Sequence, residues 1–210
     1  MVKLLHIKAT PRGDESRTVR IANAFLQAYR GANPADATET LDLFSDGIPE
    51  FDALAVAGKY ALMHGEQASA EAVARWQVVV DTVDHFKSFD KYLLTCPMWN
   101  FAIPYKLKQY IDVLVQPTLT FSFDPEAGFS GLVGDKPVQL IASRGGDYAE
   151  GTGLEQLDSQ LPYLKLILGF MGLTDVRIIT AQPLDMTTPD HSQQVLAEAI
   201  AQAAQAGAQF

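Results

Sequence analysis

Largely apolar runs of five or six residues alternate along the chain with longer stretches in which apolar residues recur every three or four positions. Continuous apolar character, as in Leu4-Leu5-His6-Ile7, is typical of strands that are buried on both faces of a parallel sheet. The pattern therefore predicts central strands at five places: residues 4–9, 40–44, 92–96, 138–142 and 176–181.

A stretch of helical periodicity follows each predicted strand. In the first, Ile21, Phe25 and Tyr29 form an apolar stripe that ends at Gly31 and Pro34. In the second, which begins near Ser69, the apolar face consists of Val73, Trp76, Val80 and Val83. The other three helices are predicted to begin at Pro104, at Leu154 and at the capping sequence Thr188-Pro189-Asp190.

Proline and glycine bear on where the helices begin and end. Pro162 lies inside the fourth predicted helix, residues 154–171, so it either kinks that helix or marks its true start. The last helix is expected to end before Gly207. Residues 45–67 are rich in Gly, Ala and Asp and show no clear period, so they receive no assignment.

The alternation of strand and helix predicts an α/β fold, a doubly wound parallel sheet with helices on both faces. Five strands in this architecture commonly take the order 2-1-3-4-5. No repeat, linker or change of composition divides the chain, so we expect a single domain over residues 1–210. Ligands of such sheets bind outside the carboxyl ends of the strands, which directs attention to the segments after the first, third and fourth strands.

Charge and composition argue against several classes of function. The chain has 25 Asp and Glu residues against 16 Lys and Arg and no basic cluster, which argues against nucleic acids and anionic membranes as partners. Its one cysteine, Cys96, excludes an intramolecular disulfide and a multi-cysteine metal site, and no metal is expected. No apolar stretch approaches the ~20 residues of a membrane span or resembles a signal peptide, so we expect a cytoplasmic protein.

The segment after the first strand gathers hydroxyl and guanidinium groups at the start of a helix. Around a glycine turn lie Thr10, Arg12, Ser16, Arg17 and Thr18. Free N–H groups and the helix dipole favour an anion there, and we interpret the segment as a phosphate site. The alternative is that one hydroxyl caps the helix while the arginines lie in solvent. A dinucleotide site would require Gly-x-Gly-x-x-Gly, which the segment lacks.

A stiff aromatic loop follows the third strand. Met98, Trp99, Asn100 and Phe101 lie there between two prolines. Such a loop offers stacking faces and aimed backbone amides, which suits a flat heteroaromatic ring. The alternative is a hydrophobic plug, which would account for Met98 or Phe101 alone but not for the amide side chain between them.

The fourth strand runs into Ser143, Arg144, Gly145 and Gly146. Paired glycines let a backbone approach a ligand closely, and the neighbouring Ser and Arg side chains supply hydrogen-bond donors. The alternative is a plain flexible turn, because two glycines alone are weak evidence of a site.

Together these segments resemble one known family, the bacterial FMN-dependent NADH:quinone oxidoreductases, also called FMN-dependent NADH-azoreductases. The resemblance rests on Thr-Pro-Arg-x-x-x-Ser-x-Thr, Pro-Met-Trp-Asn-Phe and Ser-Arg-Gly-Gly in this order. It extends over nearly the whole chain through Leu107-Lys108, Asp112, Thr120-Phe121 and Leu168-Gly169-Phe170-Met171-Gly172.

The resemblance implies a flavodoxin-like homodimer with one tightly bound FMN per subunit and NADH or NADPH as the electron donor. The matching positions for the FMN phosphate are Thr10, Ser16, Arg17 and Thr18. Those for the isoalloxazine are Met98, Trp99, Asn100 and Phe101 on one edge, and Ser143, Arg144, Gly145 and Gly146 on the pyrimidine side. Those for substrate are Phe101, Phe123, Tyr148 and Phe170.

The implied chemistry belongs to the flavin, and no catalytic side chain is expected. Donor and acceptor would occupy one site in turn, which implies ping-pong kinetics, with quinones as the physiological acceptors and azo compounds as incidental ones. The chain departs from the family at Trp99, where Tyr is commoner, at Tyr148, often His, and at 116–119, where an Arg-x-Gly is frequent. These departures bear on substrate preference.

Two other classes of function stay as alternatives. A non-catalytic FMN-binding redox sensor would share every motif. A hydrolase of the same fold would require a nucleophile with a base, but the chain lacks Gly-x-Ser-x-Gly and its four histidines, His6, His64, His85 and His191, lie outside the three loops.

Overall fold

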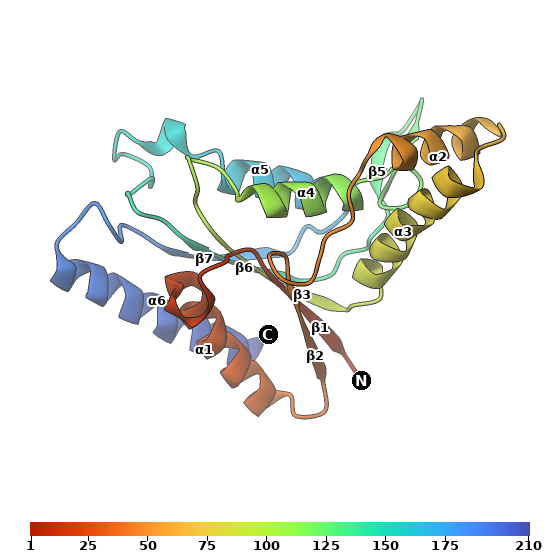
Figure 1. Cartoon of the computed structure of the whole chain (residues 1–210). Helices are drawn as coiled ribbons and strands as arrows, with labels where there is room; N and C mark the ends of the chain where they lie inside the picture. The colour runs from red at the N-terminus through yellow and green to blue at the C-terminus, as the bar shows by residue number, and fades with distance from the viewer.

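The structure is a computed structural model that describes all residues from 1 to 210. A parallel sheet of five strands lies at its centre in the order β2-β1-β3-β6-β7, which confirms the predicted order 2-1-3-4-5 (Figure 1). The strands are β1 (Lys3–Lys8), β2 (Ala37–Asp42), β3 (Lys91–Pro97), β6 (Val138–Ser143) and β7 (Val176–Ala181). None of the helices is long and apolar enough to cross a membrane.

The second strand begins earlier than the sequence pattern predicts. β2 covers residues 37–42 rather than 40–44 and pairs only with β1, at the edge of the sheet. Its first half is mostly exposed, so Thr38 and Glu39 need no apolar neighbours. No residue of β2 is fully buried, so the strand lacks the apolar run that marks the other four, including β7 at the opposite edge.

Helices cover both faces of the sheet (Figure 1). α1 (Arg17–Ala32) and α6 (Pro189–Gln209) lie on one face, while α3 (Ala70–Lys87), α4 (Tyr105–Leu114) and α5 (Leu161–Phe170) lie on the other. Successive strand residues point to opposite faces, so Leu4 packs with the first layer and Leu5 with the second. Each layer buries its own apolar core.

The last helix does not end before Gly207 as expected but continues to Gln209. A Cβ atom at residue 207 would lie 2.2 Å from the carbonyl oxygen of Phe25 in α1. The glycine therefore allows two helices to approach closely and does not terminate one. The Ala-rich sequence before Gly207, which resembles a helix end in the sequence, is the surface through which α6 packs against α1.

Residues 45–67, which received no assignment, contain the helix α2 (Ala53–His64). Asp52 caps it by accepting a hydrogen bond from the amide of Ala55 at 2.9 Å, and Gly65 ends it with a left-handed backbone. At Gly58 a Cβ would lie 2.3 Å from the carbonyl oxygen of Ala72 in α3. The helix packs through small residues, which explains why no strong apolar period reveals it.

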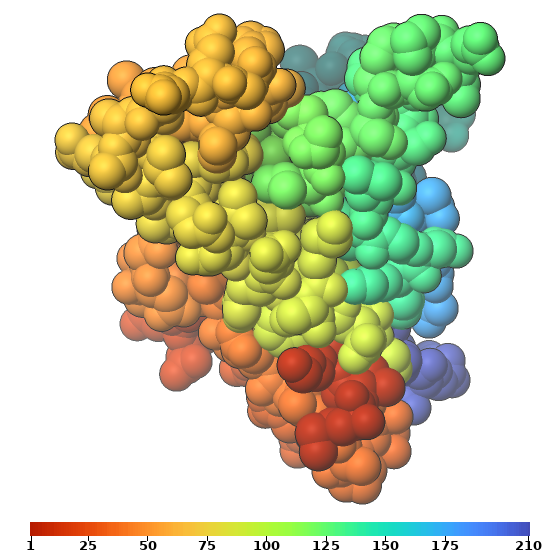
Figure 2. Space-filling model, turned by 90° about the vertical axis from the view of Figure 1, so that its right-hand side faces the viewer, coloured from red at the N-terminus to blue at the C-terminus, as the bar shows by residue number.

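The apolar face of α3 also differs from the prediction. Its buried residues include Trp76, Val79, Val83 and Phe86, whereas Val73 is exposed. The outer ends of α2 and α3 project from the molecule, and so does the hairpin of β4 (Phe121–Asp124) and β5 (Gly128–Gly131), which the sequence did not predict (Figure 2).

The structure decides between the two alternatives for Pro162, a kink in the fourth helix or the start of that helix. α5 begins at Leu161 with this proline in its first turn, so Pro162 marks the start and no kink follows. A separate short helix, η2 (Glu155–Leu157), precedes it. Another short helix, η1 (Gly13–Glu15), lies in the loop before α1.

Candidate functional site

The three predicted loops meet at the carboxyl edge of the sheet. They enclose a cavity of about 160 Å³. Its lining comprises Thr10, Arg12, Ser16, Arg17 and Thr18 from the first loop, Pro97, Met98 and Trp99 from the second, Ser143, Arg144 and Gly145 from the third, and Leu184 and Asp185. The structure therefore brings most of the predicted site residues together, while Asn100, Phe101 and Gly146 lie just outside this lining.

The start of α1 offers several unused donors to the cavity. The amides of Arg17, Thr18 and Val19 donate no hydrogen bond within the chain. Ser16 is the residue before the helix, yet its side chain does not cap it. The alternative of simple capping therefore fails for Ser16. A helix N-terminus with free amides and buried hydroxyls is suited to a phosphate group.

The two arginines of this loop behave differently. One guanidinium nitrogen of Arg17 donates to Asp185 Oδ1 at 2.7 Å and to the carbonyl oxygen of Leu184 at 3.1 Å. Arg12 is exposed and forms no ion pair, so it is the cation at the cavity without a protein counter-charge. Asp185 was not predicted, because it lies after β7 and no motif marks it.

The loop after β3 contains a strained turn. Asn100 and Phe101 have φ angles of 47° and 67°, and the amides and carbonyls of Trp99 and Ala102 on either side pair at 2.9 Å. Two positive φ values in succession are typical of a tight hairpin turn and suit Asn, but they are costly for Phe. Phe101 is 47% exposed, so it is not a hydrophobic plug. Strain of this kind is concentrated at functional sites.

The loop after β6 approaches the segment after β7 closely. At Gly145 a Cβ would lie 2.9 Å from Asp185 Oδ2, and at Gly146 one would lie 3.0 Å from Met186 Sδ. The glycines therefore allow contact with other protein atoms. Arg144 is only 3% exposed, and all three nitrogens of its guanidinium donate to protein acceptors.

Comparison with known proteins identifies the relatives of this chain. Residues 2–206 match the family described as having a flavodoxin-like fold. The chain is 44% identical over 210 residues to the FMN-dependent NADH:quinone oxidoreductase of Nitratidesulfovibrio vulgaris (strain DP4), with 100% of both chains covered. The chain belongs to the family of FMN-dependent NADH:quinone oxidoreductases.

Solved structures agree with this family. An azoreductase from Bacillus anthracis str. Sterne has a TM-score of 0.91 at 30% identity, with 100% of both chains covered. An FMN-dependent NADH-azoreductase from Bacillus anthracis str. Ames Ancestor, in complex with FMN, has a TM-score of 0.90 at 26% identity, with 100% of this chain and 99% of that one covered.

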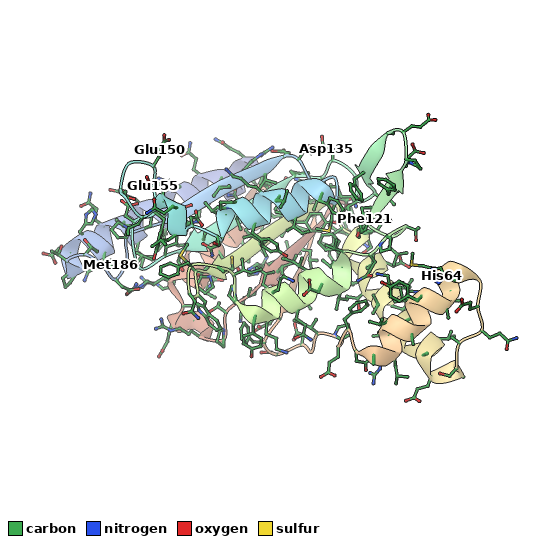
Figure 3. All side chains as sticks on the ribbon, turned by 90° about the horizontal axis from the view of Figure 1, so that it is seen from above. His64, Phe121, Asp135, Glu150, Glu155 and Met186 are labelled. Carbon is green, nitrogen blue, oxygen red and sulfur yellow. The ribbon has the colours of Figure 1, made fainter.

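The four aromatic residues that the resemblance places at the substrate site do not come together in the structure. The rings of Phe101 and Tyr148 lie 6.2 Å apart beside the cavity. Phe170 instead packs with Phe121 and Phe129, and Phe129 with Phe123, on the hairpin and the end of α5. Phe121 lies at the opposite end of the molecule from Glu150 and Met186 (Figure 3).

A larger groove adjoins the cavity of this family member on the outer side of Trp99 and Asn100. It has a volume of about 1270 Å³, is open to solvent, and is lined by α4 and by residues from around α2 and α5. Its lining includes Phe51, Lys59, Tyr105, Gln116 and Tyr163. The sequence pattern does not predict this groove, because it does not predict α2.

The cysteine beside the loop is not suited to redox chemistry. Cys96 is fully buried at the end of β3, and burial raises the pKa of its thiol to about 12. The thiol therefore stays protonated and unreactive at neutral pH.

Proposed function

We propose that this chain is an FMN-dependent oxidoreductase that passes two electrons from NADH to quinones and, incidentally, to aromatic azo compounds. The observation that carries the proposal is the cavity in which the free amides of α1, three hydroxyls and the two other loops converge. The relatives' names support the cofactor, the donor and both acceptors.

The residues of the first loop fit the phosphate of FMN. Thr10 and Ser16 are 1% and 3% exposed, and Thr10 Oγ1 donates to Ser16 Oγ at 3.4 Å, a long bond that a phosphate oxygen could replace. In this proposal Arg12 supplies positive charge, while Arg17, which is paired with Asp185, mainly fixes the loop. Thr18 bonds to Ser143 and so links the phosphate loop to the loop after β6.

The other two loops fit the ring system. When bound, FMN supplies the two-electron chemistry. Met98 and Trp99 contribute apolar surface at the cavity, and the strained turn at Asn100 holds backbone groups in a fixed orientation beside it. The rings of Phe101 and Tyr148 lie close to each other on the loops after β3 and β6, and in this proposal they stack on a flat donor or acceptor. One shared opening for both would give ping-pong kinetics.

The site is proposed to be completed by a second copy of the chain. Phe123 and Phe129 are 61% and 62% exposed, an unusual amount of aromatic surface for one hairpin. Their distance from the cavity of the same subunit supports a homodimer in which these rings and Phe170 face the partner's site. In this proposal residues 1–210 act as one domain. The cytoplasmic location, where NADH is available, stays a prediction.

The test is the visible absorption spectrum of the purified protein after reconstitution with FMN, followed by anaerobic NADH and then a quinone. We expect a flavin spectrum that bleaches with NADH and recovers with quinone. A bound flavin that NADH does not bleach would favour the redox sensor, and no binding of FMN would refute the proposal.

A pair of serine variants tests the phosphate site itself. Ser16→Ala should weaken FMN binding about tenfold, because a hydrogen bond to a charged group is lost, and leave apoprotein stability nearly unchanged, because Ser16 does not cap. The matched control is Ser69→Ala, whose side chain caps α3 by accepting from Ala72 at 3.1 Å. It should cost about 1 kcal/mol of stability and leave FMN binding intact.

A further inference from the structure

A short segment that no motif marked connects the two loops assigned to the flavin ring. Asp158, Ser159 and Gln160 lie between η2 and α5. We call these three residues the 158–160 segment. It leads into α5, which it caps: Asp158 Oδ1 accepts from the amides of Gln160 at 2.9 Å and Leu161 at 3.1 Å.

On one side the 158–160 segment binds the loop after β3. The amide of Ser159 donates to the carbonyl oxygen of Phe101 at 2.9 Å. The side-chain amide of Gln160 donates to the carbonyl oxygen and to the sulfur of Cys96, both at 3.4 Å. The contact at Phe101 falls on the strained turn, so it helps to hold a backbone conformation that this residue would otherwise avoid.

On the other side the same segment binds the loop after β6 through Arg144. Gln160 Oε1 accepts from Arg144 Nε at 3.0 Å, and Asp158 Oδ2 accepts from a terminal nitrogen of that guanidinium at 2.9 Å. The third nitrogen donates to Gln182 Oε1 at 3.1 Å. The guanidinium is therefore directed at the protein.

The hydrogen bonds that Gln160 forms with Arg144 and Cys96 are buried. Gln160 is 0% exposed and Arg144 is 3% exposed. Removing one partner from a buried network leaves charged or polar groups without hydrogen bonds, so the loops must shift to satisfy them. Gln160 thus links Cys96, near the end of β3, to Arg144, just after β6, in addition to the backbone pairing of the two strands.

We propose that Asp158 and Gln160 are positioning residues of the flavin site, which act through Arg144 and the Phe101 turn to fix the spacing of its two ring-binding loops. The proposal rests on the proposed function, because it assigns the ring to these loops. Arg144, expected from the resemblance to contact the flavin, is in this view an internal link. The consequence is that the 158–160 segment sets both the affinity for FMN and its reduction potential.

The experiment compares two buried glutamines in the full-length protein. Gln160→Met removes both links with little change of volume. Gln139→Met is the matched control, because Gln139 is 2% exposed on β6 but donates only to the carbonyl oxygens of Leu140 and Arg177, away from the loops. FMN dissociation constants, reduction potentials and thermal midpoints of the apoproteins are measured for both and for the natural sequence.

We expect Gln160→Met to weaken FMN binding about tenfold or more, the effect typical of removing a partner that orients a binding group, and to shift the reduction potential. Gln139→Met should change only the thermal midpoint. If both variants alter FMN affinity and potential equally, the proposal is overturned. If the natural sequence itself binds no FMN, the proposed function fails instead, and this is seen before any variant is compared.

Asp158→Asn serves as a second variant should Gln160→Met fold poorly. It keeps an oxygen for the two amides at the start of α5 but removes the charge that faces Arg144. FMN affinity should fall and the potential should move in the same direction as in Gln160→Met, with a smaller change in the thermal midpoint. Unchanged affinity and potential in a folded Asp158→Asn protein would contradict the role assigned to this residue.

Discussion

His6 shows how one buried side chain makes stability depend on pH. Its Nε2 lies 2.9 Å from Thr95 Oγ1 inside the sheet, and the residue is 2% exposed. Burial, assisted by the positive charges of Lys8 and Arg30, lowers the pKa of His6 from 6.5 to about 4. The folded state therefore favours the neutral imidazole, whereas the unfolded chain takes up a proton near pH 6.5.

It follows that the stabilising effect of neutral His6 is fully present above pH 6.5 and is lost as the pH falls from 6.5 towards 4. The shift corresponds to a loss of about 3 kcal/mol across this window. Urea unfolding at a series of pH values should show the loss, and His6→Gln should flatten the curve. Parallel curves for the two proteins would assign the pH dependence to other groups.

At the scale of single residues, the sequence indicates which residues lie in the three loops, but it does not indicate which way their side chains point. The hydroxyls around α1 could be found because capping needs fewer of them than the segment has. The motif of Arg144 does not reveal the protein partners of its side chain, because Asp158, Gln160 and Gln182 lie far along the chain and are brought to it only by the fold. Asp185 was missed for the same reason.

At the scale of elements, the regular spacing of apolar residues identified every helix that packs through large side chains against the sheet. It missed α2, which packs through Ala and Gly against α3, and the β4–β5 hairpin, whose aromatic residues stay exposed. The spacing of apolar residues reflects burial, so elements that bury few large apolar side chains give little signal. The same limit explains the misplaced start of β2 at the sheet edge.

The α1–α6 contact gives a test at this scale. Gly207→Ala should destabilise the protein by about 2 kcal/mol, because the added methyl group would meet the backbone of Phe25 at 2.2 Å and force the helices apart. Gly31→Ala, in α1 with no atom within 4 Å of the new Cβ, should be neutral or stabilising by up to about 1 kcal/mol. Chemical denaturation measures both; equal effects would show that the close contact is unimportant.

At the scale of the whole molecule, the two ends of the sheet have different surfaces. The carboxyl edge holds the cavity, and the aromatic hairpin contributes no residue to its lining. Exposed aromatic clusters of this size commonly mark contacts between proteins. This surface is therefore the one on which the proposed homodimer can be tested.

Phe129→Ser should therefore shift the protein towards monomer in sedimentation equilibrium and lower quinone reduction, because the ring is 62% exposed and central to the cluster. Val73→Ser, at an exposed apolar position on α3, is the control and should leave both unchanged. A Phe129→Ser protein that associates as the natural one does would rule out the hairpin as the dimer contact.

The turn at Phe101 has a consequence for laboratory evolution. Phe101 and Thr118 both hold left-handed backbone conformations that glycine adopts without strain, and Thr118 is exposed. Selection for heat resistance alone would accept glycine at either position. At 118 the change would be free of penalty, whereas at 101 it would remove an exposed ring beside the site. A library screened only for survival on heating would thus accumulate proteins with Phe101→Gly, which lack the ring proposed to stack on the substrate.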